Sequence, residues 1–108
     1  MYDVLVSPEA EADLDRIVRY LAADRGNPSA ATALADKIAA RLCDLATMPA
    51  KFSFCKDAVL RALGYHRVLA GNYVIVYRID ETAQRVLIVH FHHTLQDYEK
   101  TLLHFAER

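Results

Sequence analysis

Apolar and polar residues alternate through the second half of the chain in a pattern that predicts three consecutive antiparallel strands. Two runs rich in β-branched and aromatic residues, 65–70 and 73–79, flank the pair Gly71-Asn72. A pair that begins with glycine between two such runs is typical of a two-residue hairpin turn. A third run, 86–91, follows a short polar segment and is expected to pair with the second strand. The pattern therefore predicts a small antiparallel sheet.

The turn also fixes which residues of the first two strands face each other. With Gly71-Asn72 in the turn, alternation places one set of side chains on one face of the sheet and a second set on the other. The first face carries Tyr65, Arg67, Val76 and Arg78. The second carries His66, Val68, Ile75 and Tyr77, and His66 is expected to be buried there with its hydrogen bonds satisfied. Both faces are largely apolar, so other parts of the chain must cover them.

The first half of the chain predicts a short strand followed by two helices. Residues 2–6 alternate weakly and are expected to add to the edge of the sheet. Ser7 and Pro8 are typical of a helix start, and apolar residues then recur at helical spacing to about Asp24. A second helix is expected to begin at Pro28 and to end before Pro49. The short break between them predicts an antiparallel helical hairpin that covers one face of the sheet.

A final helix is expected after the sheet, because apolar residues recur there at spacings of three and four. They are Leu95, Tyr98, Leu102 and Phe105. The fold class is thus α+β, with an N-terminal strand and an antiparallel helical hairpin packed on a small antiparallel sheet, and with a C-terminal helix. A chain of 108 residues is expected to form a single domain over residues 1–108.

Composition changes this picture only slightly. The net charge is -1, whereas a protein that binds nucleic acid through phosphates usually carries an excess of lysine and arginine. Residues 61–93, however, hold four arginines against two acids, and four of the five histidines. No segment is typical of a membrane span or a signal peptide, so a cytoplasmic protein is expected. Cys43 and Cys55 are interpreted as reduced thiols.

His90, His92 and His93 come at the end of the last predicted strand, and Tyr98 follows about one turn later. A metal site is one interpretation, since His90 and His92 share a face, but it would also need a carboxylate or a further histidine. We predict neither a metal nor a cofactor. Acid–base chemistry on a phosphodiester is another interpretation. It needs a group that titrates near neutral pH, cations for the phosphate and an orienting aromatic group. His93, Arg67, Arg78 and Tyr98 are the candidates for these roles. Alternatively, the arginines pair with acids or solvent and the histidines bond to nearby backbone.

In its motifs the chain resembles the RelE/ParE superfamily of toxins from type II toxin-antitoxin modules. A helical hairpin precedes the residues that carry the likeness: Gly64, Tyr65, Arg67, Gly71, Asn72, Tyr73, Tyr77, Arg78, Asp80, His93, Gln96, Asp97 and Tyr98. The resemblance implies a small toxin that is held silent by a cognate antitoxin protein, whose disordered tail folds on binding. The exposed parts of the helical hairpin and the sheet would form the surface to which the antitoxin binds.

The resemblance implies one of two activities. One branch of the superfamily cleaves mRNA on the ribosome, and the other inhibits DNA gyrase without a known catalytic set. His93 and Tyr98 fall where nucleases of the first branch have functional residues. The cations on the central strands of the best-known nuclease are replaced here by His66, Val68 and Val74. Ribosome-dependent mRNA cleavage is the expected function, with gyrase inhibition and a non-toxic antitoxin-binding remnant as the alternatives.

Overall fold

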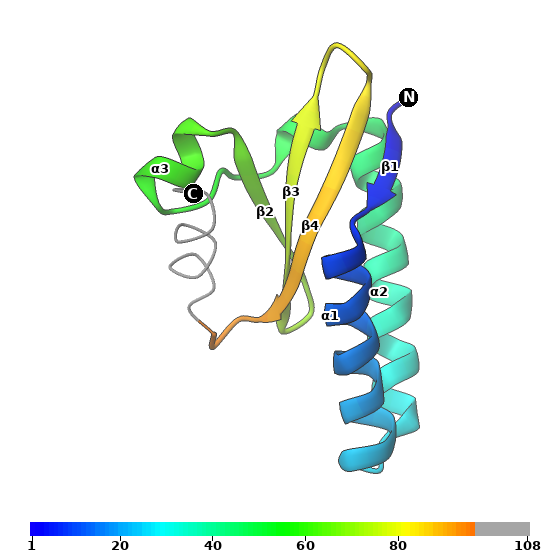
Figure 1. Ribbon diagram of the computed structural model, residues 1–108. Coiled ribbons are helices and arrows are strands. Elements are labelled where there is room, and N and C mark those ends of the chain that lie inside the picture. Colours follow the sequence, from blue (N-terminus) through cyan, green and yellow to red (C-terminus); the bar gives the residue numbers. More distant parts are fainter. Residues whose placement is uncertain (97–108) are drawn as a thin grey trace.

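The computed structural model describes residues 1–96 of the chain, and its centre is a four-stranded sheet (Figure 1). The strands are β1 (Asp3–Val6), β2 (Tyr65–Ala70), β3 (Tyr73–Asp80) and β4 (Arg85–His93). Their order across the sheet is β1-β4-β3-β2. β1 pairs with β4 in parallel, and the other neighbours are antiparallel. The three predicted C-terminal strands and the N-terminal edge strand are therefore confirmed.

Two long helices precede the three antiparallel strands. α1 (Pro8–Arg19) continues into a π-helical segment, η1 (Tyr20–Asp24), and α2 is Pro28–Thr47. Each helix begins as the sequence predicts, with proline at the first position and a side-chain cap before it. The caps are the Ser7 hydroxyl and the Asn27 amide oxygen, which accept from the N–H groups of Ala10 and Ala30 respectively.

The β2–β3 hairpin has the predicted register, with Tyr65 opposite Arg78 and Arg67 opposite Val76. Gly71 occupies the first turn position with a φ of +61°. Only glycine adopts this conformation without strain, and a positive φ at the first central position alone defines a type II′ turn. The turn chemistry of Gly71 thus sets the alignment of the whole ribbon.

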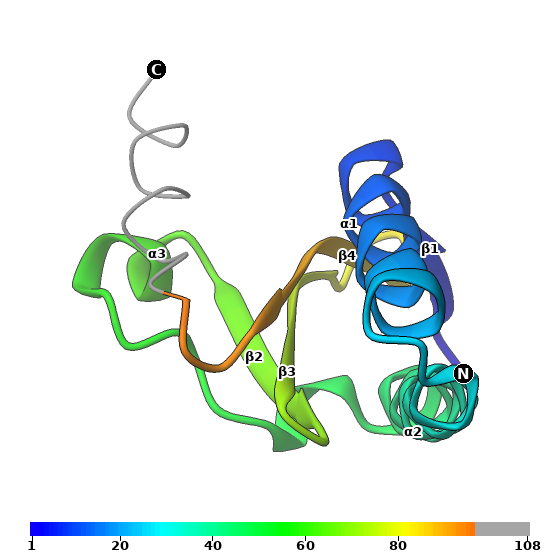
Figure 2. The same ribbon diagram turned by 90° about the horizontal axis from the view of Figure 1, so that it is seen from below.

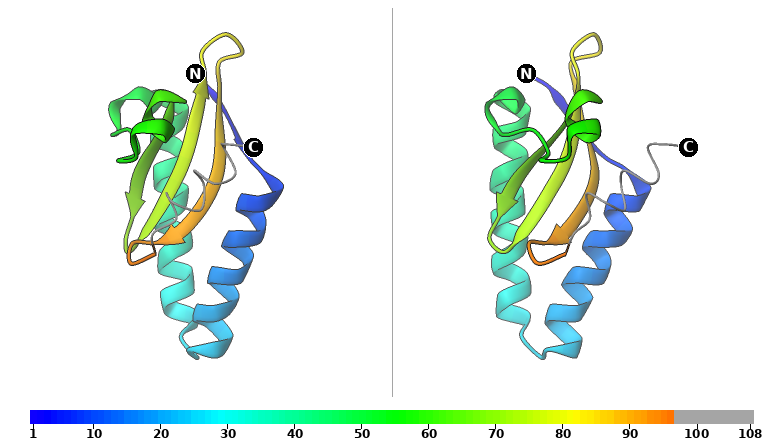
Figure 3. Two further views of the ribbon diagram at one scale, coloured as in Figure 1. Left: turned by 60° about the vertical axis from the view of Figure 1, so that its left-hand side comes forward. Right: turned by 90° about the vertical axis from the view of Figure 1, so that its left-hand side faces the viewer.

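The helical hairpin covers one face of the sheet, and the segment between α2 and β2 covers part of the other (Figure 2). On the hairpin side the core includes Leu34, Ile38, Leu45, Val68, Ile75, Tyr77, Ile88 and Phe91. On the opposite side Cys55 and Leu60 pack against Val74 and Val76. His66 is buried as expected, with Nδ1 at 3.0 Å from the carbonyl oxygen of Phe52. The tip of the helical hairpin projects past the end of the sheet (Figure 3).

Two features differ from the sequence predictions. Between α2 and β2, where no element was predicted, the chain contains a 3-10 turn, η2 (Pro49–Lys51), and a short helix, α3 (Ala58–Ala62), capped by the Asp57 carboxylate. The first helix also changes to π-helical hydrogen bonding at Tyr20, and each N–H then bonds to the carbonyl five residues earlier. The predicted C-terminal helix lies outside the described residues. Across the part of the chain that is described, no helix combines the length and the apolar character needed to cross a bilayer.

Candidate functional site

His93 lines an open pocket of about 780 Å³ between the helical hairpin and the ends of β3 and β4. Helix α1 supplies one wall, η1 supplies the next, and the two strand ends close the third side. Besides His93, the lining side chains that carry polar or aromatic groups are Asp15, Arg16, Arg19, Tyr20, Asp24, Tyr73 and Gln96. Ala12 and Ile17 form its apolar part. The pocket therefore combines both charge signs with three aromatic rings.

Local contacts fix the His93 ring at the end of β4. The ring meets Tyr73 edge-on, with 5.2 Å between the ring centroids. Its Nδ1 accepts a hydrogen bond from the N–H of Leu95 at 3.0 Å, and its backbone N–H donates to Gln96 Oε1 at 3.2 Å. When Nδ1 accepts, Nε2 carries the proton of the neutral ring. In this arrangement His93 presents a hydrogen-bond donor.

The π segment brings Tyr20 towards Tyr73 across the pocket. Arg25 donates through Nη1 to the Tyr20 hydroxyl at 3.4 Å. Burial raises the pKa of Tyr73 above its usual value, Tyr20 raises it further, and the charge of Arg25 opposes the shift. Tyr73 is consequently a neutral phenol at physiological pH and acts as a hydrogen-bonding group with an apolar ring.

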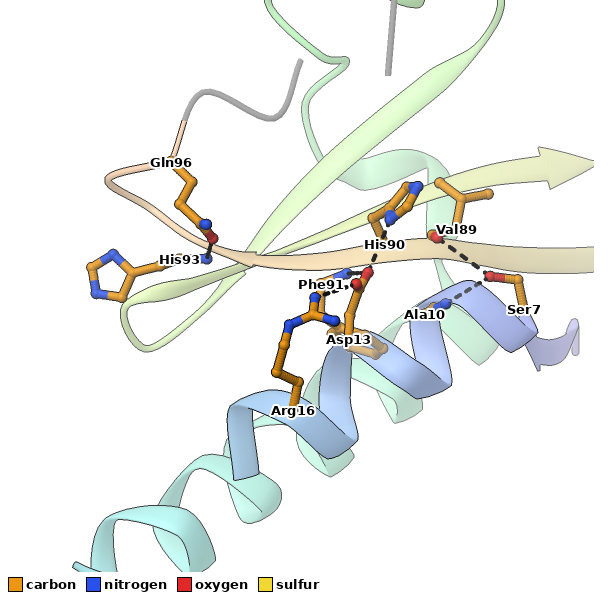
Figure 4. A network of polar contacts seen from close by, with 9 residues as sticks. All are labelled: Ser7, Ala10, Asp13, Arg16, Val89, His90, Phe91, His93 and Gln96. Carbon is orange, nitrogen blue, oxygen red and sulfur yellow. Dashed lines mark hydrogen bonds and ion pairs between the residues drawn. The ribbon is translucent and has the colours of Figure 1, made fainter. Parts of the chain in front are cut away.

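The other two histidines of the cluster serve the fold. His90 Nδ1 lies 2.9 Å from Asp13 Oδ2, and the same oxygen accepts from the backbone N–H of Phe91 at 3.2 Å. His92 is buried, with Nδ1 at 2.9 Å from the carbonyl oxygen of His93. Figure 4 shows Asp13 reaching from α1 to β4, while the His93 ring points away from that contact. Within residues 1–96, no three His, Cys, Asp or Glu side chains converge as metal ligands would.

The structure does not bring His93 together with Arg67 and Arg78. His93 pairs with Tyr73, which faces the helical hairpin, whereas Arg67 pairs with Val76, which faces away from it. Two positions three residues apart on one strand point to opposite faces. The sequence interpretation grouped these residues because the register between β3 and β4 was not assigned.

The two arginines also lie in separate places on the far face. Arg67 lines a pocket beside α3 and the loop before it, together with Lys51, Lys56 and Arg61. Arg78 lines another pocket with acidic and apolar neighbours, and its guanidinium lies 5.5 Å from the ring centre of Tyr65. Tyr98, the fourth predicted site residue, lies outside the described residues.

Several residues of the His93 pocket were missed or interpreted differently from the sequence. Arg16 and Arg19 were not among the predicted site residues, and Tyr73 was named only for the motif resemblance. Tyr20 and Gln96 were given no role in a site. The position of Tyr20 in the pocket depends on the π segment. Hydrophobic periodicity along the sequence does not distinguish a π segment from the α-helix that it continues.

Comparison with known proteins agrees with the resemblance drawn from the motifs. The profile of a family described as the ParE toxin of the type II toxin-antitoxin system parDE matches residues 4–98. The fold and this match together define the chain as a small α+β toxin of the RelE/ParE superfamily. Within that class, the chain belongs to the ParE toxin family. No curated protein matches the chain in sequence.

Two solved structures share the fold. One is described as the chromosomal ParDE toxin-antitoxin system from P. aeruginosa; it is 17% identical, with a TM-score of 0.64, and the alignment covers 86% of this chain and 96% of that one. The other is the toxin-antitoxin complex RelBE2 from Mycobacterium tuberculosis, at 22% identity and a TM-score of 0.60, covering 85% and 96%. At this level of identity the likeness shows the fold alone.

Proposed function

We propose that this toxin inhibits growth by binding a protein target, DNA gyrase, and not by cleaving mRNA. The observation that supports this choice is the separation of His93 from Arg67 and Arg78 on the two faces of the sheet. The match to the ParE family agrees with it. Gyrase inhibition was the alternative at the level of sequence, and the arrangement of the described residues favours it over the expected nuclease.

The chemistry of RNA cleavage explains why the separation matters. A base or acid must reach the ribose or the leaving oxygen at hydrogen-bond distance, while cations stabilise the charge on the same phosphate. His93 presents Nε2 to the hairpin side, and the two arginines lie on the other side. One phosphate cannot contact both sets through the thickness of the sheet.

Supercoiling by purified gyrase tests this proposal. The full-length toxin is expected to block ATP-dependent supercoiling of a relaxed plasmid at concentrations comparable to that of the enzyme. His93→Ala and Arg67→Ala should inhibit as well as the wild type, within about twofold, because neither acts as a catalytic group. Unaffected supercoiling at a large excess of the toxin would contradict the proposal.

We also propose that a cognate antitoxin neutralises the toxin by docking in the His93 pocket. An amphipathic segment needs an apolar floor and polar edges, and here Ile17 and Tyr73 form the floor while Arg16, Arg19 and Asp24 lie at the edges. Side chains beside the pocket are exposed, as for Tyr20 with 44% of its surface accessible. The pocket therefore suits a helical segment of mixed charge.

Calorimetric titration with the antitoxin encoded beside the toxin tests the docking site. Tyr20→Ala is expected to weaken binding by at least tenfold, because aromatic residues at the centre of an interface carry much of its affinity. The matched control is Met48→Ala, which removes an exposed apolar side chain of 61% accessibility away from the pocket. Equal affinities for the wild type and Tyr20→Ala would show that the antitoxin binds a different surface of the toxin.

A further inference from the structure

A second pocket lies on the other edge of the sheet, where the chain passes from α2 to β2. It has a volume of about 600 Å³, which is within the range of pockets that hold small ligands. Five of its lining residues are cations: Arg41, Lys51, Lys56, Arg61 and Arg67. None of the described residues that line it is acidic. In a chain of net charge -1, this gathering of positive charge at one place is a local feature.

The cations come from five parts of the chain, which are α2, η2, the loop before α3, α3 and β2, and they differ in how they are held. Arg41 donates through Nε to the carbonyl oxygen of Leu69 at 2.8 Å and through Nη1 to Asp44 at 3.0 Å, so it frames the pocket. Arg61 Nε contacts the carbonyl oxygen of Cys55 at 3.4 Å. Lys51 and Lys56 are exposed. A ligand therefore meets two exposed ammonium groups beside two guanidinium groups that are held by hydrogen bonds.

An exposed phenyl ring accompanies this charge. Phe54 is 47% exposed, and one face of its ring stacks on His66 with 4.1 Å between centroids and 27° between planes. His66 stacks in turn on the buried Tyr77, at 5.2 Å and 15°. The stack of three rings runs from the core to the surface and holds Phe54 in place. The outward side of that ring is thus a fixed apolar platform beside the cations.

We propose that this pocket binds single-stranded nucleic acid, with phosphates at Lys51 and Lys56 and a base stacked on Phe54. A cationic groove with an aromatic platform is the usual arrangement for such binding, because every base has an aromatic face and every linkage has a charge. An acidic peptide would use the cations but would gain little from the exposed ring. The site shares no lining residue with the His93 pocket and lies at the β2 edge of the sheet.

Fluorescence anisotropy with labelled oligodeoxythymidine and oligouridine, each of about 12 nucleotides, tests the proposal on the full-length toxin. The wild type is expected to bind with an affinity that falls as salt rises. Lys51→Ala/Lys56→Ala should weaken binding at least tenfold and make the slope of log K against log salt shallower by about 1.4, since each phosphate contact to a single strand contributes about 0.7. The ratio of the two affinities distinguishes DNA from RNA as the preferred strand.

The control pair is Lys37→Ala/Arg85→Ala, which removes the same charge from exposed positions outside the pocket and should leave affinity within twofold. Phe54→Leu keeps an apolar side chain but removes the stacking platform, and it is expected to lower affinity about tenfold with an unchanged salt slope. Far-UV circular dichroism verifies that each variant is folded.

Three results would overturn the proposal. They are no binding by the wild type at low salt, equal losses for the pocket and control pairs, and competition by poly-glutamate as effective as that by the oligonucleotide. The gyrase assay is independent of these outcomes, because it measures inhibition of supercoiling and not binding of the free strand.

Discussion

Asp13 links α1 to the sheet through a group of buried polar contacts. Only 6% of its surface is exposed, and it accepts hydrogen bonds from His90, Phe91 and Arg16 at 2.9, 3.2 and 2.7 Å. The β3–β4 register skips Val89 at this point, which makes a bulge. A carboxylate from α1 thus satisfies a strand N–H next to the irregular position.

The cost of Asp13→Ala follows from these contacts. Without the carboxylate, the buried backbone N–H of Phe91 would lose its hydrogen bond to Asp13. Leaving a buried N–H unsatisfied costs about 1–3 kcal/mol. The partly buried His90 would lose its contact with Asp13, and this adds about 1 kcal/mol. Arg16, with 62% of its side chain exposed, contributes about 0–1 kcal/mol because water screens the pair. We expect a loss of about 3 kcal/mol, a large part of the roughly 5–15 kcal/mol of a typical domain.

Urea unfolding of the purified toxin, followed by circular dichroism, measures this loss. Asp13→Asn retains an oxygen that can accept from Phe91, so its loss should be about 1 kcal/mol smaller. Asp15→Ala is the control, because this acid is exposed on the same helix, and it should change the free energy of unfolding by less than about 0.5 kcal/mol. A loss below about 1 kcal/mol for Asp13→Ala would refute the role assigned to this carboxylate.

Three further substitutions test the fold, each by urea unfolding. Tyr77→Phe removes a buried hydroxyl that donates to the carbonyl oxygen of Pro49 at 2.6 Å, and should cost about 1–2 kcal/mol at neutral pH. Burial also raises the pKa of Tyr77, so in the wild type its contribution is complete below pH ~10 and is lost at higher pH, where the unfolded chain ionises first. The phenylalanine variant should therefore lose less stability between pH 9 and about 11, and an unchanged pH profile would contradict this. Gly71→Ala places a Cβ 3.3 Å from the Lys37 side chain at a φ of +61°, and should cost about 1–2 kcal/mol; a neutral effect would show that the turn relaxes. Ser7→Ala removes the cap of α1 and should cost about 1 kcal/mol, and no loss would mean that the helix start is held by other contacts.

Local sequence signals predicted most of the sheet and the helical hairpin. The turn at Gly71 fixed the β2–β3 register, and proline after a capping residue placed both helix starts, because these signals act over a few residues. The 3-10 turn and α3 were not predicted. They form because Cys55 and Leu60 fill the uncovered face of the sheet, which is a tertiary effect that periodicity along the chain does not contain.

The candidate site was predicted less well than the fold. His93 was placed correctly at the end of a strand, but its grouping with Arg67 and Arg78 required the pairing of β3 with β4. A bulge at Val89 changes that pairing by one residue, and a shift of one residue moves a side chain to the other face. Residues that different elements bring together, such as Tyr20 and Tyr73, are visible only once the helices are docked.

Mapping of transcript 5′ ends after induction of the toxin, in cells without the antitoxin, tests the central claim most directly. With both wild type and His93→Ala, growth should stop, DNA-damage signalling should rise, and the 5′ ends should match those of uninduced cells. New 5′ ends within coding regions that appear with the wild type and vanish with His93→Ala would contradict the account and restore mRNA cleavage as the activity.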